Sequence, residues 1–147
     1  MTADTIKARI LVVIQLACII FIFASGRPVA NHFLLLLIQS AGMAIGIWAL
    51  AAMGIGNMNI SPLVKDGAAL VTRGPYRLIR HPMYLAVLLV IYPLIIDGFS
   101  FLRIAAGLIL TIDLTIKMLF EEGLLKKQFT EYEAYMKTTK RLIPLLF

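Results

Sequence analysis

Four apolar runs dominate this chain and restrict the folds that it can adopt. They cover residues 10–25, 33–55, 82–96 and 101–120. A helix needs roughly 20 apolar residues to cross a bilayer. In addition, 61% of the chain is hydrophobic, against roughly 45–50% in soluble domains. The sequence therefore predicts an all-α integral membrane protein with four transmembrane helices, in a single domain that covers residues 1–147.

Two of the runs are short for a membrane span. Residues 10–25 follow a basic N-terminus and end in small residues at 24–26, a pattern that is also typical of a signal peptide. We favour a retained span, because the rest of the chain is embedded in the membrane as well. Residues 82–96 contain Pro93, which kinks or ends a helix. A tight turn joins them to residues 101–120, and these two runs predict a helical hairpin.

The basic residues predict the orientation. Four spans place the N-terminus, the loop 57–81 and the tail 121–147 on one side of the membrane. That side carries eleven of the fourteen lysines and arginines, whereas the other side carries Arg27 and Arg103. The positive-inside rule then predicts that both termini are cytoplasmic.

The tail combines charged residues with a regular set of apolar and aromatic ones. This spacing is typical of an amphipathic helix that lies along a membrane surface. The residues concerned are Leu124, Leu125, Phe129, Tyr132, Tyr135 and Met136. We therefore expect a cytoplasmic tail helix beside the loop 57–81.

Within the second apolar run, Gly42 and Gly46 form a GxxxG pattern. Such glycines let two helices approach closely. The pattern fits packing against another helix of the same chain, and it also fits a homodimer. Sequence alone leaves both interpretations open.

The polar segment of residues 70–84, which we call the hub, is the richest in chemical groups. Arginines at positions 73, 77 and 80 and His81 lie beside two tyrosines. A turn at Gly74-Pro75 is expected, and Pro82 suits the first turn of a helix, whose N-terminus favours anions. The hub is a candidate for binding a charged ligand, although charge alone favours a loop that only anchors the chain.

Three ionisable residues in regular spacing lie in the fourth apolar run and directly after it. Asp113, Lys117 and Glu121 are four residues apart, so they share one helix face. Ionisable groups at membrane depth are functional candidates, while an Asp113–Lys117 ion pair is the structural alternative. Glu121 and Glu122 reach the side on which the cations of the hub lie. A ligand with positive and negative groups fits such a site.

These segments together resemble a known family. The stretch from Leu70 to Tyr76, the Arg80-His-Pro-Met-Tyr84 box and the Glu121-Glu122 pair are the main elements, followed by a tyrosine-rich tail that ends in Arg141-Leu-Ile-Pro. In this order they resemble the isoprenylcysteine carboxyl methyltransferase family, which groups with membrane phospholipid methyltransferases. The resemblance covers residues 57–144 and is to the compact prokaryotic type, which implies a prokaryotic inner membrane.

The resemblance implies a membrane methyltransferase that uses S-adenosylmethionine (SAM) without a Rossmann fold. The cofactor pocket would lie between the hub and the tail. The candidate cofactor-binding residues are Leu70, Val71, Gly74, Tyr76, His81, Pro82, Met83, Tyr84, Glu121 and Glu122.

Three residues are candidates for the catalytic set. Lys117 stands where family members commonly have a substrate-orienting arginine, and Arg80 and Arg141 are candidates for binding a carboxylate. The chain departs from the family at Lys117 and at Ala68, where the carboxyl methyltransferases have a histidine. These departures concern the methyl acceptor, which we expect to be a carboxylate, a thiol or a lipid headgroup that enters from the bilayer.

Two other functions remain open. Sterol-type membrane reductases that use NADPH have a similar Arg-His-Pro box, although they tend to have asparagine where this chain has Met83. A non-catalytic membrane subunit is the second alternative. We expect no nucleic acid partner, because no basic stretch is free of the bilayer. We also expect no metal, because His32 and His81 fall on opposite sides of the membrane.

Overall fold

The computed structural model describes residues 2–54, 61–63, 67 and 69–143, and over this part of the chain the fold is helical. The prediction of an all-α protein is confirmed. The α-helices are α1 (Ala3–Ala24), α2 (Phe33–Met53), α3 (Pro82–Asp97), α4 (Phe101–Gln128) and α5 (Tyr132–Thr138), and a 3₁₀ turn, η1 (Gly74–Arg77), lies in the hub.

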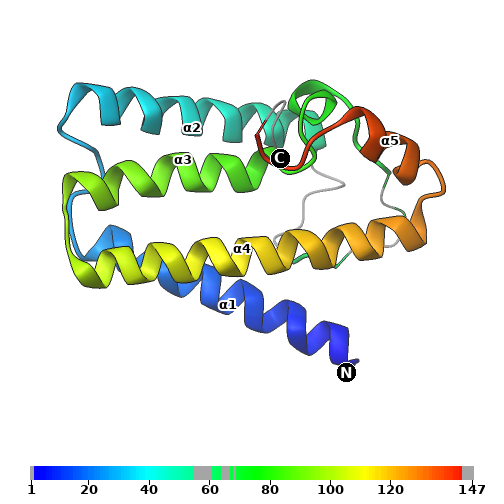
Figure 1. The fold of residues 1–147 in the computed structure, drawn as a ribbon, viewed down its shortest axis with the longest axis horizontal. Coiled ribbons are helices and arrows are strands. Elements are labelled where there is room, and N and C mark those ends of the chain that lie inside the picture. The colour runs from blue at the N-terminus through cyan, green and yellow to red at the C-terminus, as the bar shows by residue number, and fades with distance from the viewer. Residues whose placement is uncertain (1, 55–60, 64–66, 68, 144–147) are drawn as a thin grey trace.

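The four long helices form an elongated bundle (Figure 1). Helix α2 packs along α3, α4 runs along the other side of α3, and α1 crosses beneath α4. The α1–α2 and α3–α4 connections lie together at one end, which we call the loop end. The start of α1, the hub and α5 lie at the opposite end, the hub end. The bundle therefore brings the hub and the tail together.

Among the described residues, α1 and α2 are long and apolar enough to cross a membrane, and α3 is apolar but has only 16 residues. Large apolar side chains on their outer faces are exposed, including Val13 and Phe33. An exposed apolar surface of this extent is typical of a membrane-facing surface. The topology with four spans and cytoplasmic termini stays a prediction.

The tail differs from the predicted single helix. Helix α4 continues beyond Phe120 to Gln128, because residues 121–128 contain no proline and keep the helical pattern of the run before them. Only Tyr132–Thr138 form a separate helix. Residue 55 of the second predicted span, part of the loop 57–81 and residues 144–147 lie outside the described residues.

The glycines of α2 pack against α3 within the chain. A Cβ atom on Gly42 would lie 2.7 Å from the Leu89 Cβ and 3.1 Å from the Ala86 carbonyl oxygen, and one on Gly46 would lie 3.4 Å from the Ala86 Cβ. This close approach explains the GxxxG pattern without a partner chain. A homodimer through Gly42 and Gly46 remains untested.

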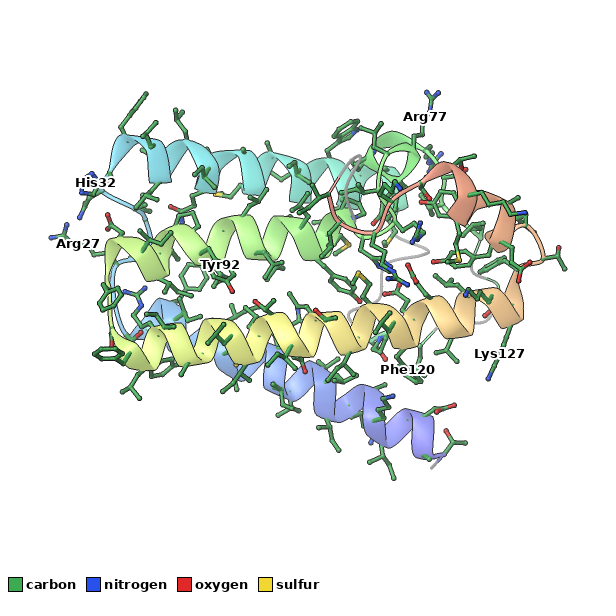
Figure 2. All side chains as sticks on the ribbon, in the orientation of Figure 1. Arg27, His32, Arg77, Tyr92, Phe120 and Lys127 are labelled. Carbon is green, nitrogen blue, oxygen red and sulfur yellow. The ribbon has the colours of Figure 1, made fainter. Side chains whose placement is uncertain are left out.

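Between α3 and α4, polar contacts supplement the apolar core. Tyr92 points from α3 towards α4 (Figure 2), and its hydroxyl lies 2.8 Å from the Thr111 hydroxyl. Buried apolar residues of α1, α3 and α4 form the main core, which includes Ile22, Leu94 and Leu110. This packing fixes α4, and with it the charged residues of its second half.

Candidate active site

The tail covers the hub through backbone contacts. Ile79 and Lys140 form an isolated parallel β-bridge. The Arg80 amide donates to the Lys140 carbonyl (2.7 Å), and the His81 amide donates to the Arg141 carbonyl (3.0 Å). Residues 79–81 are thus held directly against residues 140–141, which confirms that hub and tail lie together.

Local sequence explains the shape of the hub. Gly74 has a φ of +60°, which favours glycine, and a Cβ there would lie 2.8 Å from the Ala52 Cβ and 3.3 Å from Trp48 Nε1. Pro75 lies in the first turn of η1 and Pro82 begins α3. Gly74 therefore serves the turn and its packing against α2.

Glu122 is the centre of a charged cluster that joins α4, the hub and the tail. Its Oε1 accepts a hydrogen bond from Arg80 Nε (2.8 Å) and lies 3.3 Å from His81 Nε2, while its Oε2 accepts from Arg141 Nε (3.1 Å). Arg80 Nη1 also donates to the Thr139 carbonyl (2.5 Å). We call Glu122, Arg80, His81 and Arg141 the Glu122 cluster.

The cluster stabilises the charged form of its carboxylate. Burial alone raises the pKa of Glu122, but the hydrogen bonds from His81 and Arg80 and their charges outweigh it and lower the pKa to about 2. Glu122 is 3% exposed. Its carboxylate is thus ionised at neutral pH, and both of its oxygens already have partners.

Glu121 has a different environment from its neighbour. Its Oε2 accepts a hydrogen bond from the Tyr84 hydroxyl (2.7 Å) and lies 3.8 Å from His81 Nδ1. The rings of His81 and Tyr84 stack, with centroids 5.3 Å apart. His81 therefore lies between the two carboxylates, and the partly exposed Glu121 is the one that faces an open space.

Lys117 lies one helical turn before Glu121 on α4 and is 1% exposed. Its ammonium donates a hydrogen bond to Oε1 of Gln15 on α1 (2.5 Å) and lies 5.8 Å from the centre of the Tyr84 ring. Asp113 is not its ion-pair partner, and both oxygens of Asp113 lack a hydrogen bond within the described residues. The predicted alternative of an Asp113–Lys117 pair is therefore not what the structure contains.

These side chains surround a cavity of about 120 Å³ at the hub end, which we call the hub cavity. Residues from α1, α2, the hub, α3 and α4 line it. They are Gln15, Met53, Tyr76, Arg80, His81, Met83, Tyr84, Val87, Lys117 and Glu121. The cavity thus brings together one partly exposed carboxylate, one buried ammonium and three aromatic rings.

Within this lining, Tyr76 has a buried hydroxyl without a hydrogen-bond partner among the described residues. Burial, and then the nearby Glu121 carboxylate, raise the pKa of Tyr76 above its ordinary value. The phenol therefore stays neutral and remains a hydrogen-bond donor. A buried polar atom of this kind is expected to meet a partner, which a bound ligand would supply.

An apolar groove of about 380 Å³ adjoins the hub cavity. It lies between α1, α2 and α3, and Gly42 and Gly46 form part of its wall. Met83 and Val87 line both spaces. A molecule with a polar head and an apolar chain therefore has two adjoining spaces of matching character.

The predicted residues divide into three groups. Tyr76, Arg80, His81, Met83, Tyr84, Lys117 and Glu121 line the hub cavity. Glu122 and Arg141 lie in the adjoining charged cluster. Leu70, Val71, Gly74 and Pro82 are not among the lining residues of the cavity.

Sequence reasoning missed Gln15, Met53 and Val87. Gln15 could have been found as an isolated polar residue in an apolar run. Met53 and Val87 carry no comparable signal, because they are apolar residues in apolar runs. Neither Arg73 nor Arg77, which an NADPH site in the hub would use, lines the hub cavity. Arg73 donates to the Ala52 carbonyl (2.9 Å), and Arg77 points away from the bundle (Figure 2).

Comparison with protein families places a match over most of the chain. The profile of the phospholipid methyltransferase family matches residues 30–132, more than two thirds of the chain. The matched part contains α2, the hub, α3 and α4, and it leaves out Gln15 and Arg141. No curated protein matches the chain significantly.

Proposed function

This chain belongs to the phospholipid methyltransferase family, a family of membrane methyltransferases, and we propose that it uses SAM and that the hub cavity is its active site. The observation that carries the proposal is the meeting of Glu121, Tyr84, His81 and Lys117 around one cavity within the matched residues. SAM supplies a methyl group that its sulfonium has already activated, so the protein contributes binding and orientation.

The groups around the cavity suit the polar end of SAM. Glu121 is the carboxylate best suited to the ammonium of the cofactor, because its Oε1 accepts no hydrogen bond from the described residues. The unpartnered Tyr76 hydroxyl is a donor for the carboxylate or a ribose oxygen of the cofactor. Ligand pockets usually measure roughly 300–1,000 Å³, so we expect SAM to widen the cavity of about 120 Å³.

The contacts of the two arginines favour a supporting role. Arg80 and Arg141 both bind Glu122, so both guanidinium groups already have an acidic partner before any ligand binds. We therefore assign them to holding the tail on the hub rather than to contact with the methyl acceptor. Glu122 is saturated by the same contacts, which leaves Glu121 as the proposed cofactor ligand.

Lys117 and the apolar groove suit the acceptor. The Lys117 ammonium uses one of its three N–H groups on Gln15 and keeps the others for an oxygen or sulfur nucleophile. A hydrocarbon chain of the acceptor would occupy the groove beside Met83 and Val87. We propose that the acceptor is lipophilic, with its reactive head at the hub cavity on the cytoplasmic face.

The direct test of the cofactor is calorimetric titration of the detergent-purified chain with SAM, S-adenosylhomocysteine and NADPH. We expect micromolar binding of the first two and a loss of about tenfold or more in Glu121→Gln, because a hydrogen bond to a charged group contributes about 1.5–3 kcal/mol. Glu133→Gln, the same change at an exposed glutamate on α5, should bind as the wild type does. Binding of NADPH alone would favour the reductase function. Binding of none of the three compounds would favour a non-catalytic subunit.

The acceptor requires a second assay. Transfer of labelled methyl from SAM to membrane lipids, prenylated acids and thiols should occur with the wild-type protein. Lys117→Ala should lower turnover more than SAM affinity, because we assign Lys117 to the acceptor. An equal loss of turnover and affinity would remove this role from Lys117.

A further inference from the structure

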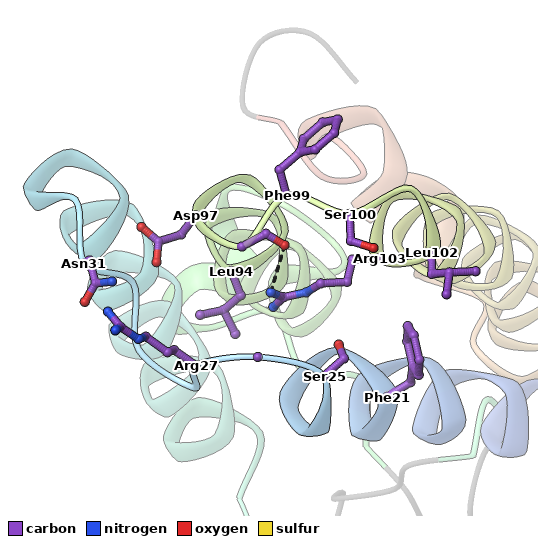
Figure 3. A pocket seen from close by; sticks show the side chains of 12 residues that line it. Phe21, Ser25, Arg27, Asn31, Leu94, Asp97, Phe99, Ser100, Leu102 and Arg103 are labelled. Carbon is purple, nitrogen blue, oxygen red and sulfur yellow. Dashed lines mark hydrogen bonds between the residues drawn. The ribbon is translucent and has the colours of Figure 1, made fainter.

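A second cavity lies at the loop end, at the opposite end of the bundle from the hub cavity. It measures about 560 Å³ and lies between the C-terminus of α1, the α1–α2 connection and the α3–α4 turn (Figure 3). Its wall includes Arg27, Asn31, Asp97, Ser100 and Arg103. We call it the loop-end cavity, and no part of the proposed methyl transfer uses it.

Arg103 is the unusual residue of this cavity. It is 3% exposed, and its guanidinium donates to the carbonyl oxygens of Gly98 (3.0 Å) and Ile22 (3.2 Å). Nε has no hydrogen-bond partner among the described residues, and no acid among them forms an ion pair with it. A buried charge without an opposite charge is costly, so an anion beside Arg103 would be strongly stabilised.

The surrounding backbone accommodates this arginine. A Cβ on either Gly26 or Gly98 would collide with the Arg103 guanidinium. Glycine at both positions is therefore what lets the side chain lie between α1 and α3. Figure 3 shows it beneath the α3–α4 turn, at the wall of the cavity.

Other groups at the same wall favour an anion. Helix α4 begins at Phe101, and the side chain of its N-cap residue Ser100 makes no capping hydrogen bond. The first N–H groups of α4 thus keep their affinity for an anion. Arg27 adds a second, exposed cation, and Asp97 is the one acid of the lining, where its Oδ1 accepts a long hydrogen bond (3.4 Å) from the His32 amide.

The rim of the cavity is apolar and exposed. Phe99 is 68% exposed and Leu102 is 69% exposed, and both belong to the lining of the cavity. If the helices cross the bilayer, this end lies at the depth of the headgroups. We propose that the loop-end cavity binds the phosphodiester group of a membrane phospholipid in the leaflet opposite the active site, with Arg103, Arg27 and the start of α4 on the phosphate.

The proposal depends on the membrane topology and not on methyl transfer. It is tested by native mass spectrometry of the full chain in detergent, titrated with phosphatidylethanolamine and phosphatidylglycerol. Diacylglycerol, which has no phosphate, and inorganic phosphate serve as parallel probes. We expect one tightly held phospholipid per chain. Diacylglycerol alone and inorganic phosphate alone should each bind at least tenfold more weakly. If Asp97 contacts an amine, phosphatidylethanolamine should bind better in wild type, and Asp97→Asn should remove the difference.

Two substitutions at the cavity and one control at the hub end identify the site. Arg27→Gln, which leaves the buried arginine and its helix contacts in place, should weaken the bound phospholipid several-fold. Arg77→Gln, the same change at an exposed arginine of the hub end, should leave it unchanged. Arg103→Lys, which keeps the charge and loses the planar fork, should weaken it about tenfold. Equal effects of Arg27→Gln and Arg77→Gln, or binding of diacylglycerol or inorganic phosphate as tight as that of phospholipid, would overturn the proposal.

Discussion

Replacing Glu122 with glutamine tests how the hub, α4 and the tail are held together. The substitution keeps the size of the side chain and removes its charge. Arg80, His81 and Arg141 then surround a neutral amide, and Arg80 is almost fully buried. We expect a large loss of stability, because removing one partner of a buried ion pair leaves the other charge uncompensated.

The shift in the pKa of Glu122 sets the magnitude of the expected loss of stability. The cluster lowers it from 4.5 to about 2. Each unit corresponds to about 1.4 kcal/mol, which gives roughly 3–4 kcal/mol of stabilisation at neutral pH. This agrees with the roughly 3–5 kcal/mol expected on breaking a buried pair. Because the pKa is lowered on folding, the contribution is complete above pH 4.5 and is lost as the pH falls towards 2.

The assay is unfolding by sodium dodecyl sulfate in mixed micelles, followed by circular dichroism at pH 7 and at several values from pH 5 to pH 3. Glu122→Gln should lower the free energy of unfolding by about 3–4 kcal/mol at pH 7 and should lose stability less steeply than the wild type below pH 4.5. Glu133→Gln is the matched control. A loss below about 1 kcal/mol, or an unchanged pH profile, would refute the account of the Glu122 cluster.

Three further predictions concern the active site and the bundle. Gln15→Leu removes the acceptor of the Lys117 hydrogen bond. It should lower kcat about tenfold with little change in SAM affinity, because a small misplacement of a reacting group slows the reaction. Gln128→Leu is the exposed control, and a parallel loss of SAM binding in Gln15→Leu would contradict the assignment of Lys117 to the acceptor. Gly42→Ala should destabilise the bundle by about 1–3 kcal/mol through overpacking, measured by the same unfolding assay. Gly46→Ala should destabilise it less, because its added Cβ has more room. Equal effects would contradict the close packing of Gly42 against α3. Trp48, the one tryptophan of the chain, packs against the hub at Gly74. If SAM widens the hub cavity, the fluorescence of Trp48 should change and saturate as SAM is added. An unchanged spectrum at saturation would contradict a widening of the hub cavity.

The apolar runs were sufficient to predict the main helices. The run 82–96 corresponds to α3 (Pro82–Asp97), and Pro93 lies within that helix without ending it. The run 101–120 predicted only part of α4, because the boundary was set by hydrophobicity. Helix formation does not end where hydrophobicity does, so the polar residues after Phe120 continue the same helix to Gln128.

The candidate site was predictable where the residues are polar and close in sequence. The sequence alone indicates His81, Tyr84 and Glu121 as candidates, and the family resemblance that includes them is confirmed by the family match. The partner of Lys117 was not predictable, because Gln15 lies 102 residues earlier in the chain and only the crossing of α1 under α4 brings them together. The burial of Arg103 was missed for a similar reason, since a cation at the end of a span is ordinarily exposed.

The assignment of the hub cavity to SAM is tested most directly by photocrosslinking. Ultraviolet irradiation of the full chain with radiolabelled SAM, followed by peptide mapping, should label peptides from the hub and from α4 around Glu121. Excess S-adenosylhomocysteine should abolish this labelling. Label confined to the loop end, or label that S-adenosylhomocysteine does not displace, would contradict the account.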